Sequence, residues 1–148
     1  MRHVRYDAWY NYISKLLNDF VPDGKTLIEF ACGTGIVMEK LCIEGWETTG
    51  VDLSKGMLEQ ASERDCLSIS NRKLVCGDMR SVDLEKKFDA AICLYDSINY
   101  CLTIEDVSKA LQNVSKHLHS DGLFVFDVCT LRNCRYNFQN DVDEEQYH

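Results

Sequence analysis

The sequence predicts an α/β domain built on a mostly parallel sheet. Short apolar runs typical of buried strands alternate with amphipathic stretches typical of helices, and glycine or a helix-capping residue separates many of them. Strands joined through helices pair in parallel with right-handed crossovers. A chain of 148 residues can bury one substantial core, so we expect a single domain over residues 1–148.

The first half of the chain begins with a helix. Apolar residues at helical spacing predict this helix over residues 7–20, and Pro22-Asp23-Gly24 provides the turn that ends it. Ser54 is a suitable N-cap for a later helix. The elements expected after the first helix are a strand at 25–30, a helix at 36–44, a strand at 46–53 and a helix at 55–65.

The second half is expected to add three strands and the best-marked helix. The strands fall at 73–78, 88–95 and 123–128. Thr103 and Asp106 suit the first and last positions of a capping box, and Asp121-Gly122 is expected to stop the helix that they open. Its predicted apolar face consists of Val107, Ala110, Leu111, Val114 and Leu118. Residues 129–148 form a polar tail with no clear periodicity.

Composition excludes several classes of function. The net charge of −8 argues against nucleic acid and anionic membranes as partners, and no apolar run approaches a membrane span. The eight cysteines include no C-x-x-C pair and form no zinc spacing with the histidines, so we expect no metal site. A secreted disulfide scaffold is the alternative, but no signal peptide is visible, and reduced thiols in the cytoplasm are expected.

Acidic residues follow the predicted strands, at the edge of the sheet where ligands bind in such folds. They are Glu29, Asp52, Asp78 and Asp96. Four acids on one rim suit a polyphosphate poorly, because like charges repel. A phosphate-binding P-loop would need a lysine after the glycines, and none is present. A dinucleotide fingerprint begins well with Gly33-Thr34-Gly35, but its third glycine would fall at Met38.

Four stretches in order resemble the motifs of class I S-adenosylmethionine-dependent methyltransferases of the small-molecule type. They are LIEFACGTG, GVDLSKGML, VCGDM and FDAAICLYDSINY, within a resemblance that runs from about Tyr6 to Asp127. It implies a Rossmann-like three-layer sandwich, methyl transfer (EC 2.1.1.-), S-adenosyl-L-methionine as cofactor and S-adenosyl-L-homocysteine as product. It also implies a helical lid at 1–24, an α/β core at 25–128 and a tail at 129–148.

The resemblance assigns cofactor-binding roles along the rim. Glu29 would bind the methionine ammonium, and Asp52 would accept from the ribose hydroxyls. Asp78 would accept from the adenine amino group. The further expected cofactor-binding residues are Tyr6, Ala31, Gly33, Gly35, Leu53, Met57, Met79 and Leu94.

Polar residues after the fourth strand are the expected acceptor side. In the resembled family this loop lies near the methyl acceptor, which implies catalytic roles for Asp96, Asn99 and Tyr100. The alternative is that Asp96 and Asn99 cap a turn while Tyr100 packs in the core. The proline-containing motif of DNA base methylation is absent, so a small molecule with a nitrogen or oxygen nucleophile is the expected acceptor.

The chain departs from the resembled family after its fifth strand, where two more strands are usual. Either it is a fragment of a longer protein, which we favour, or it is a naturally shortened domain. The fifth strand would then lie at an exposed edge, where the tail or a second copy in a homodimer would cover it. A catalytically silent cofactor-binding module is therefore an alternative to an active enzyme, and a dinucleotide-dependent oxidoreductase is a weaker one.

Overall fold

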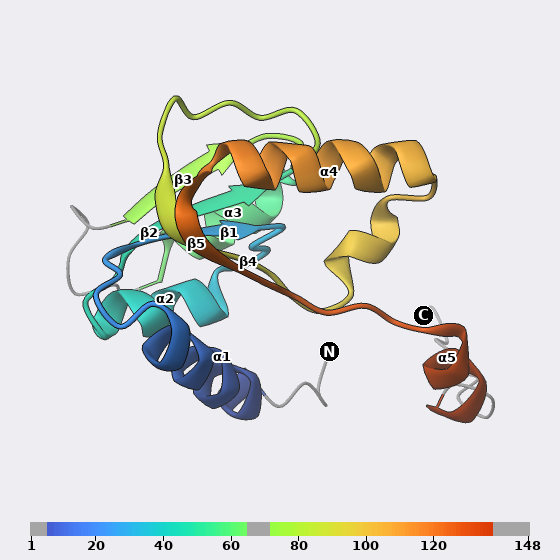
Figure 1. Ribbon diagram of the computed structural model, residues 1–148, viewed down its shortest axis with the longest axis horizontal. Helices are drawn as coiled ribbons and strands as arrows, with labels where there is room; N and C mark the ends of the chain where they lie inside the picture. Colours follow the sequence, from blue (N-terminus) through green and yellow to red (C-terminus); the bar gives the residue numbers. More distant parts are fainter. Residues whose placement is uncertain (1–5, 65–71, 138–148) are drawn as a thin grey trace, which may run out of the picture.

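The computed structural model describes residues 6–64 and 72–137, apart from the side chains of Tyr6, Cys134, Tyr136 and Asn137. Its centre is a sheet of five parallel strands in the order β3-β2-β1-β4-β5 (Figure 1). This arrangement confirms the predicted α/β class. The strands are β1 (Thr26–Phe30), β2 (Glu47–Asp52), β3 (Arg72–Cys76), β4 (Phe88–Cys93) and β5 (Leu118–Phe126).

Helices cover both faces of the sheet. The helical elements are α1 (Tyr6–Phe20), α2 (Ile36–Ile43), α3 (Lys55–Ser62), the 3-10 turn η2 (Ser97–Tyr100), α4 (Ile104–Lys116) and α5 (Leu131–Asn137), of which α5 does not cover the sheet (Figure 1). Ile13 and Leu17 of α1 join Val37 and Leu41 of α2 in one buried cluster on the sheet. Val114 of α4 belongs to a second cluster, and α4 lies across the sheet from α1 and α2 (Figure 1). Both faces of the central strands are therefore buried, as their continuous apolar runs predict.

The first strand is fixed at its start by a carboxylate from its neighbour. Asp89 Oδ2 in β4 accepts hydrogen bonds from the backbone N–H groups of Lys25 and Thr26 and from the Thr26 hydroxyl, each at 2.9 Å. These bonds lower the pKa of Asp89 despite the cost of its partial burial. The register of β1 against β4 therefore has polar support at the end opposite the acidic rim.

The end of α4 differs from the expectation. The helix ends at Lys116, and β5 begins only two residues later, whereas the sequence predicted a helix running on to Asp121-Gly122. Those two residues lie instead in an irregularity of the β4–β5 pairing, between Leu118 and Leu123. A Cβ atom at Gly122 would lie 3.2 Å from the Asp89 carbonyl oxygen, so glycine allows the close approach of the two strands.

Two further expectations about the second half and the thiols need correction. The tail contains the helix α5, which stands apart from the sheet at the end of an extended segment (Figure 1). Thr130 Oγ1 accepts from the Asn133 N–H at 3.2 Å, a local cap that a search for apolar periodicity does not detect. Cys42 is disulfide-bonded, so the expectation of reduced thiols is wrong at that position. Cys32, Cys76, Cys93 and Cys101 remain free.

Membrane-spanning helices and metal-binding clusters are both absent from the described residues. None of the helices there has the length and apolarity needed to cross a bilayer. Within the same residues, no group of three or more histidine, cysteine or acidic side chains could hold a metal ion.

Candidate functional site

A turn with unusual backbone geometry connects β1 to α2. Ala31, Gly33 and Gly35 all have positive φ angles, of 54°, 53° and 71°. Glycine adopts this left-handed conformation without strain, whereas alanine does not, so the surrounding structure must hold Ala31 there. A Cβ atom at Gly33 would meet nothing within 4 Å, which leaves open space beside the backbone of the turn.

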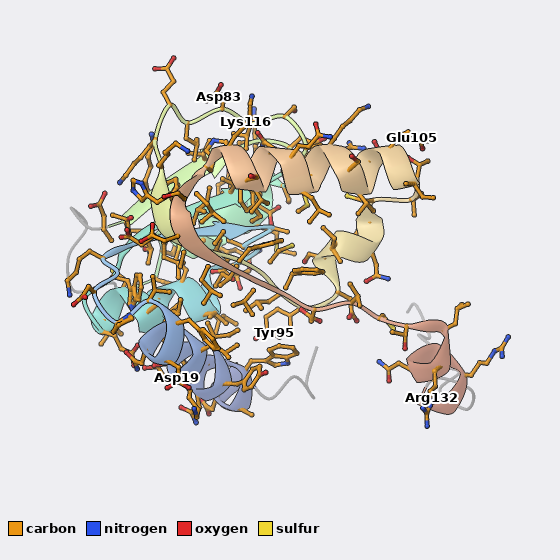
Figure 2. The ribbon with its side chains drawn as sticks, viewed as in Figure 1. Asp19, Asp83, Tyr95, Glu105, Lys116 and Arg132 are labelled. Atoms are coloured by element: carbon orange, nitrogen blue, oxygen red, sulfur yellow. The ribbon has the colours of Figure 1, made fainter. Side chains whose placement is uncertain are left out.

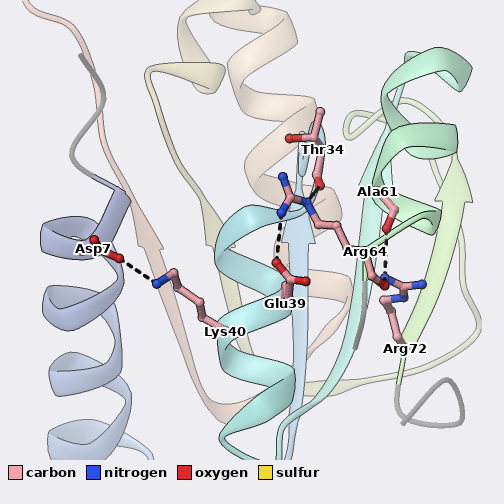
Figure 3. Close-up of polar contacts among 7 residues, drawn as sticks. All are labelled: Asp7, Thr34, Glu39, Lys40, Ala61, Arg64 and Arg72. Carbon is pink, nitrogen blue, oxygen red and sulfur yellow. Dashed lines mark hydrogen bonds and ion pairs between the residues drawn. The ribbon is translucent and has the colours of Figure 1, made fainter. Parts of the chain in front are cut away.

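Arg64, just after the carboxyl end of α3, contacts the same turn. Arg64 Nε donates to the Thr34 carbonyl oxygen at 2.5 Å, and Arg64 Nη1 pairs with Glu39 of α2 at 3.0 Å (Figure 3). On the other side of α2, Lys40 pairs with Asp7 of α1 at 2.7 Å (Figure 3). Arg64 therefore contacts the turn directly, and α2, which follows the turn, is tied to α1 by Lys40; the sequence alone did not mark Arg64 for this role.

Glu29, at the end of β1, is a buried carboxyl group with an unsatisfied oxygen. Its side chain is only 3% exposed, and Oε2 has no hydrogen-bond partner. Burial raises the pKa of Glu29 to about 8, against a lowering by the Met38 N–H, and the negative charge of Asp52 raises it further. A buried acid without a partner is costly for the folded protein, and it is the group that a cationic ligand would satisfy.

Asp52, at the end of β2, joins two turns through its carboxylate. Oδ2 accepts from the Gly33 N–H and Oδ1 accepts from the Ser54 N–H, both at 2.8 Å. Each oxygen keeps a second lone pair for a ligand hydroxyl. Ser54 also caps α3 through its side chain, as the sequence predicted. The acid therefore stands where the glycine turn and the start of α3 meet.

The residues after Asp52 leave apolar surface on this rim. Leu53 is 68% exposed and Met57 is half-buried. Leu94 differs from them, because it is 2% exposed within the cluster beneath α1 and α2. A ligand on the rim can pack against the first two side chains, but it would reach Leu94 only through the backbone.

The loop after β3 carries Asp78 and is attached to α4. Asp78 forms a close ion pair with Arg80, which lowers the pKa of Asp78. Asn113 of α4, 5% exposed, donates to the carbonyl oxygens of Met79 and Val82 at 3.0 and 2.9 Å. The conformation of this loop is therefore set by a helix more than thirty residues away along the chain, which motif spacing did not indicate.

The ends of β4 and β5 bring two acids together. Asp96 has a φ of 58°, and its N–H donates to Asp127 Oδ2 at 3.0 Å. Asp127 Oδ1 is buried and has no partner. Partial burial, a side-chain hydrogen bond with Asp127 and the charge of Asp127 raise the pKa of Asp96. Sequence reasoning identified Asp96 but gave Asp127 no role, since its position was marked only by the end of the fifth strand.

Two residues near Asp96 differ in their surroundings: Asn99 is hydrogen-bonded to the backbone, and Tyr100 is exposed to solvent. The Asn99 amide exchanges two hydrogen bonds of 3.0 Å with the Cys129 backbone, so it ties the loop after β4 to the chain after β5. Tyr100 is 85% exposed, which excludes the alternative that it packs in the core. The rings of Tyr95 and Trp9 meet edge-to-face, with 5.7 Å between their centroids, and Tyr95 lies beside α1 (Figure 2). The Tyr6 side chain lies outside the described residues.

A cavity of about 200 Å³, lined by both charged and apolar side chains, lies at the opposite end of the sheet. Its lining includes Arg72, whose Nη1 donates to the Ala61 carbonyl oxygen at 2.9 Å and so holds the end of α3 (Figure 3). Lys86, also in the lining, pairs with Glu47. These charged groups serve neighbouring structure, so the acidic rim at the carboxyl ends of the strands is the candidate site.

The fold is that of an α/β domain whose ligand-binding edge carries two acids and a glycine turn, without the lysine of a phosphate-binding loop. The family whose description is "Methyltransferase domain" matches residues 27–122, and the chain belongs to this family. Met38, where a dinucleotide fingerprint would need glycine, is 1% exposed beneath the turn.

Named relatives agree with this membership. The chain is 35% identical over 130 residues to "Putative methyltransferase YqeM" of Bacillus subtilis, which covers 86% of this chain and 50% of that protein. It is 32% identical over 122 residues to the dTDP-3-amino-3,4,6-trideoxy-alpha-D-glucopyranose N,N-dimethyltransferase of Streptomyces venezuelae, covering 82% and 50%. The chain spans about half the length of these relatives.

Solved structures show the same fold. The SAM-bound amino pentose methyltransferase CalS10 of Micromonospora echinaspora has a TM-score of 0.80 and 27% identity, over 87% of this chain and 53% of that one. A S-adenosylmethionine-dependent methyltransferase of Clostridium acetobutylicum has a TM-score of 0.77 and 33% identity, over 86% and 52%.

We predict that Glu29→Gln stabilises the ligand-free protein at neutral pH. The folded-state pKa of about 8 exceeds the ordinary value of 4.5, so the folded state holds the extra proton between these values. Wild-type stability therefore falls as pH rises through that window, and at pH 7.5 the variant gains about 2–4 kcal/mol in free energy of unfolding. Urea unfolding from pH 4.5 to 8 measures this, with exposed Glu59→Gln as the control. Parallel pH curves for wild type and Glu29→Gln would contradict it.

Proposed function

We propose that the chain binds S-adenosyl-L-methionine and transfers its methyl group to a small-molecule acceptor, leaving S-adenosyl-L-homocysteine. The observation that carries the proposal is the buried, unpartnered Glu29 Oε2 beside the glycine turn and Asp52. When bound, the cofactor supplies a methyl group on a positively charged sulfur. Several relatives and one solved structure are named as N-methyltransferases of sugars or amino acids, so we favour an amine over an oxygen nucleophile.

The rim residues fit the parts of this cofactor. The Glu29 carboxyl group would ionise as it binds the methionine ammonium, releasing its proton to solvent, while the backbone of Ala31, Gly33 and Gly35 would hold the methionine moiety. Asp52 accepts from the ribose hydroxyls through lone pairs that its two backbone bonds leave available. The adenine part is assigned to Leu53, Met57, Asp78, the Met79 backbone and the Leu94 backbone, and Tyr6 is the remaining residue assigned to the cofactor.

The acceptor is assigned to the ends of β4 and β5. Methyl transfer is an in-line displacement in which the amine lone pair attacks the methyl carbon as the carbon–sulfur bond breaks, so much of the rate comes from positioning. Asp96, held against Asp127, would accept a hydrogen bond from the amine N–H, orient the lone pair, and take the proton as the carbon–nitrogen bond forms. Asn99 fixes the loop through Cys129, and the exposed Tyr100 borders the entry.

The proposal also covers the oligomeric state of the protein and its location in the cell. A homodimer through the β5 edge is supported by the position of β5 as an outer strand of the sheet, and by Phe126 at its end and Val128 just after it, which are 45% and 50% exposed. A purely monomeric species in sedimentation at high concentration would contradict it. A cytoplasmic location is supported by the free thiols of Cys32 and Cys93. The disulfide at Cys42 is the observation that opposes it. Cell fractionation that recovers the chain outside the cytoplasm would overturn that location.

We predict that Asp52→Ala selectively removes recognition of the ribose. Calorimetry is expected to show that wild type binds S-adenosylhomocysteine and ignores NADH, and that it binds the 2′-deoxy analogue roughly tenfold more weakly. In Asp52→Ala the two nucleosides bind with equal, weakened affinity, because the acceptor for that hydroxyl is gone. A general loosening of the turn would instead weaken both ligands and preserve their ratio, and that result would contradict the assigned role.

Methyl transfer separates an enzyme from a silent binding module. The silent binding module is the second candidate function. It is supported by Asn99, an expected catalytic residue, because the Asn99 side-chain amide is hydrogen-bonded to the Cys129 backbone. With radiolabelled cofactor and a panel of amines, phenols and carboxylates, we predict label in an amine and a loss of about 10²–10⁴-fold in rate for Asp96→Asn. Unchanged cofactor affinity in that variant is the control. Binding without transfer to any acceptor would favour the silent module.

A further inference from the structure

A buried amide on α4 has no part in the chemistry proposed above, yet it holds the loop that follows β3. Asn113 is 5% exposed, and its side-chain Nδ2 donates to the carbonyl oxygens of Met79 and Val82 at 3.0 and 2.9 Å. A side-chain amide carries two N–H donors, so both of them are used on this loop. Asn113 therefore fixes two points of the loop at once, which a hydroxyl or an ionised carboxylate in its place could not do.

Two neighbours on the same face of α4 support this contact. Arg80 Nη1 lies 3.1 Å from Asp106 Oδ1, in the first turn of the helix. At the other end, His117 Nε2 accepts from the Leu84 N–H at 3.1 Å. Asn113 lies between Asp106 and His117 along the helix, so α4 is attached to the loop near its start, in its middle and near its end.

The part of the loop that Asn113 holds is a tight turn that begins at Asp78. The Asp78 carbonyl oxygen accepts from the N–H groups of Ser81 and Val82 at 3.0 and 2.8 Å. Asp78 Oδ1 accepts from the Arg80 N–H at 2.8 Å. The Met79 N–H is the exception in this turn, because no group in the described part of the chain accepts from it.

The Met79 N–H points out of the turn. It shares a trans peptide with the Asp78 carbonyl group, so the two groups point in opposite directions, and the carbonyl group faces its partners inside the turn. The turn begins beside the end of β2, where the Gly77 N–H donates to the Asp52 carbonyl oxygen at 3.0 Å. A free backbone donor therefore stands on the rim, close to the acid assigned to the ribose.

Adenine offers the acceptor that such a donor needs. Its ring nitrogens carry lone pairs in the plane of the ring, and replacing one nitrogen by carbon removes an acceptor while the ring keeps its shape. A donor that is held in place before binding gains more from a hydrogen bond than one that must first be ordered. Asn113 supplies this order, because it bonds the carbonyl groups of both Met79 and Val82 and so prevents the turn from opening.

We propose that Asn113 is a positioning residue for the cofactor, which holds the turn after Asp78 so that the Met79 N–H donates to a ring nitrogen of adenine. This inference rests on the cofactor assignment proposed above. It adds to that assignment a residue of α4 that lies behind the loop and acts only through the backbone of Met79.

The test compares S-adenosylhomocysteine with its 1-deaza, 3-deaza and 7-deaza analogues by calorimetry on the full chain. Wild type is expected to bind at least one analogue roughly tenfold more weakly than the parent compound, because that analogue lacks the acceptor for the Met79 N–H. Asn113→Leu nearly keeps the volume of the side chain and removes both donors, so the ratio for that analogue is expected to fall to about twofold or less. A general loss of stability would weaken the parent and the analogues alike and leave the ratio unchanged.

Two further variants on the same face of α4 serve as controls. His117→Leu removes the acceptor of the Leu84 N–H but keeps both Asn113 bonds, so it is expected to lower the melting temperature and preserve the ratio. Asn113→Ser fits the same space and keeps one donor, so it is expected to retain part of the ratio. It provides the test if Asn113→Leu does not fold.

Three outcomes would overturn the inference, and they differ from one another. If wild type binds the parent and all three analogues equally, the Met79 N–H does not contact the ring, although the cofactor assignment still stands. If the Asn113 variants keep the wild-type ratio, or His117→Leu lowers it as much as they do, Asn113 is not the positioning residue. If wild type binds none of the four compounds, the cofactor assignment fails and this inference fails with it.

Discussion

The buried carboxyl group of Glu29 is the constraint on which the organisation of this rim depends. A parallel sheet brings the ends of β1 and β2 to one edge, so Glu29 and Asp52 come close together in surroundings that disfavour charge. Among the residues that the structure describes, no lysine or arginine forms an ion pair with either of these two acids. It leaves one oxygen of Glu29 without a partner, which costs stability and reserves the position for a positive group.

The glycine turn makes that reserved position accessible. Positive φ angles at Ala31, Gly33 and Gly35 bend the backbone away from the helical path, and Asp52 holds the bend through the Gly33 N–H. Gly50 contributes from below, where a Cβ atom would lie 2.7 Å from Cys32 Sγ and 2.9 Å from Met38 Sδ. Close packing under the turn and open space above it are therefore two consequences of the same small residues.

Much of this was predictable from the sequence, because the relevant signals are local. Apolar runs and caps identified the alternation of strands and helices, and the end of each strand fixed where Glu29 and Asp52 would stand. The Arg80–Asp106 pair and the contacts of Asn113 with the loop after β3 were not predictable in this way. They join residues 26 to 34 positions apart, and nothing in the spacing of a single chain shows which polar group faces which. The early end of α4 was missed because apolar periodicity continued through Leu118, while the pairing of β5 with β4 decided the structure.

The central claim is that Glu29 is a proton-holding acid that ionises to bind an ammonium group. The most direct measurement is the number of protons released when S-adenosylhomocysteine binds at pH 7, from calorimetry in buffers of different ionisation enthalpy. With a pKa of about 8 in the free protein, wild type should release close to one proton, and Glu29→Gln should release none. Tight binding to wild type with no proton exchanged would contradict the claim.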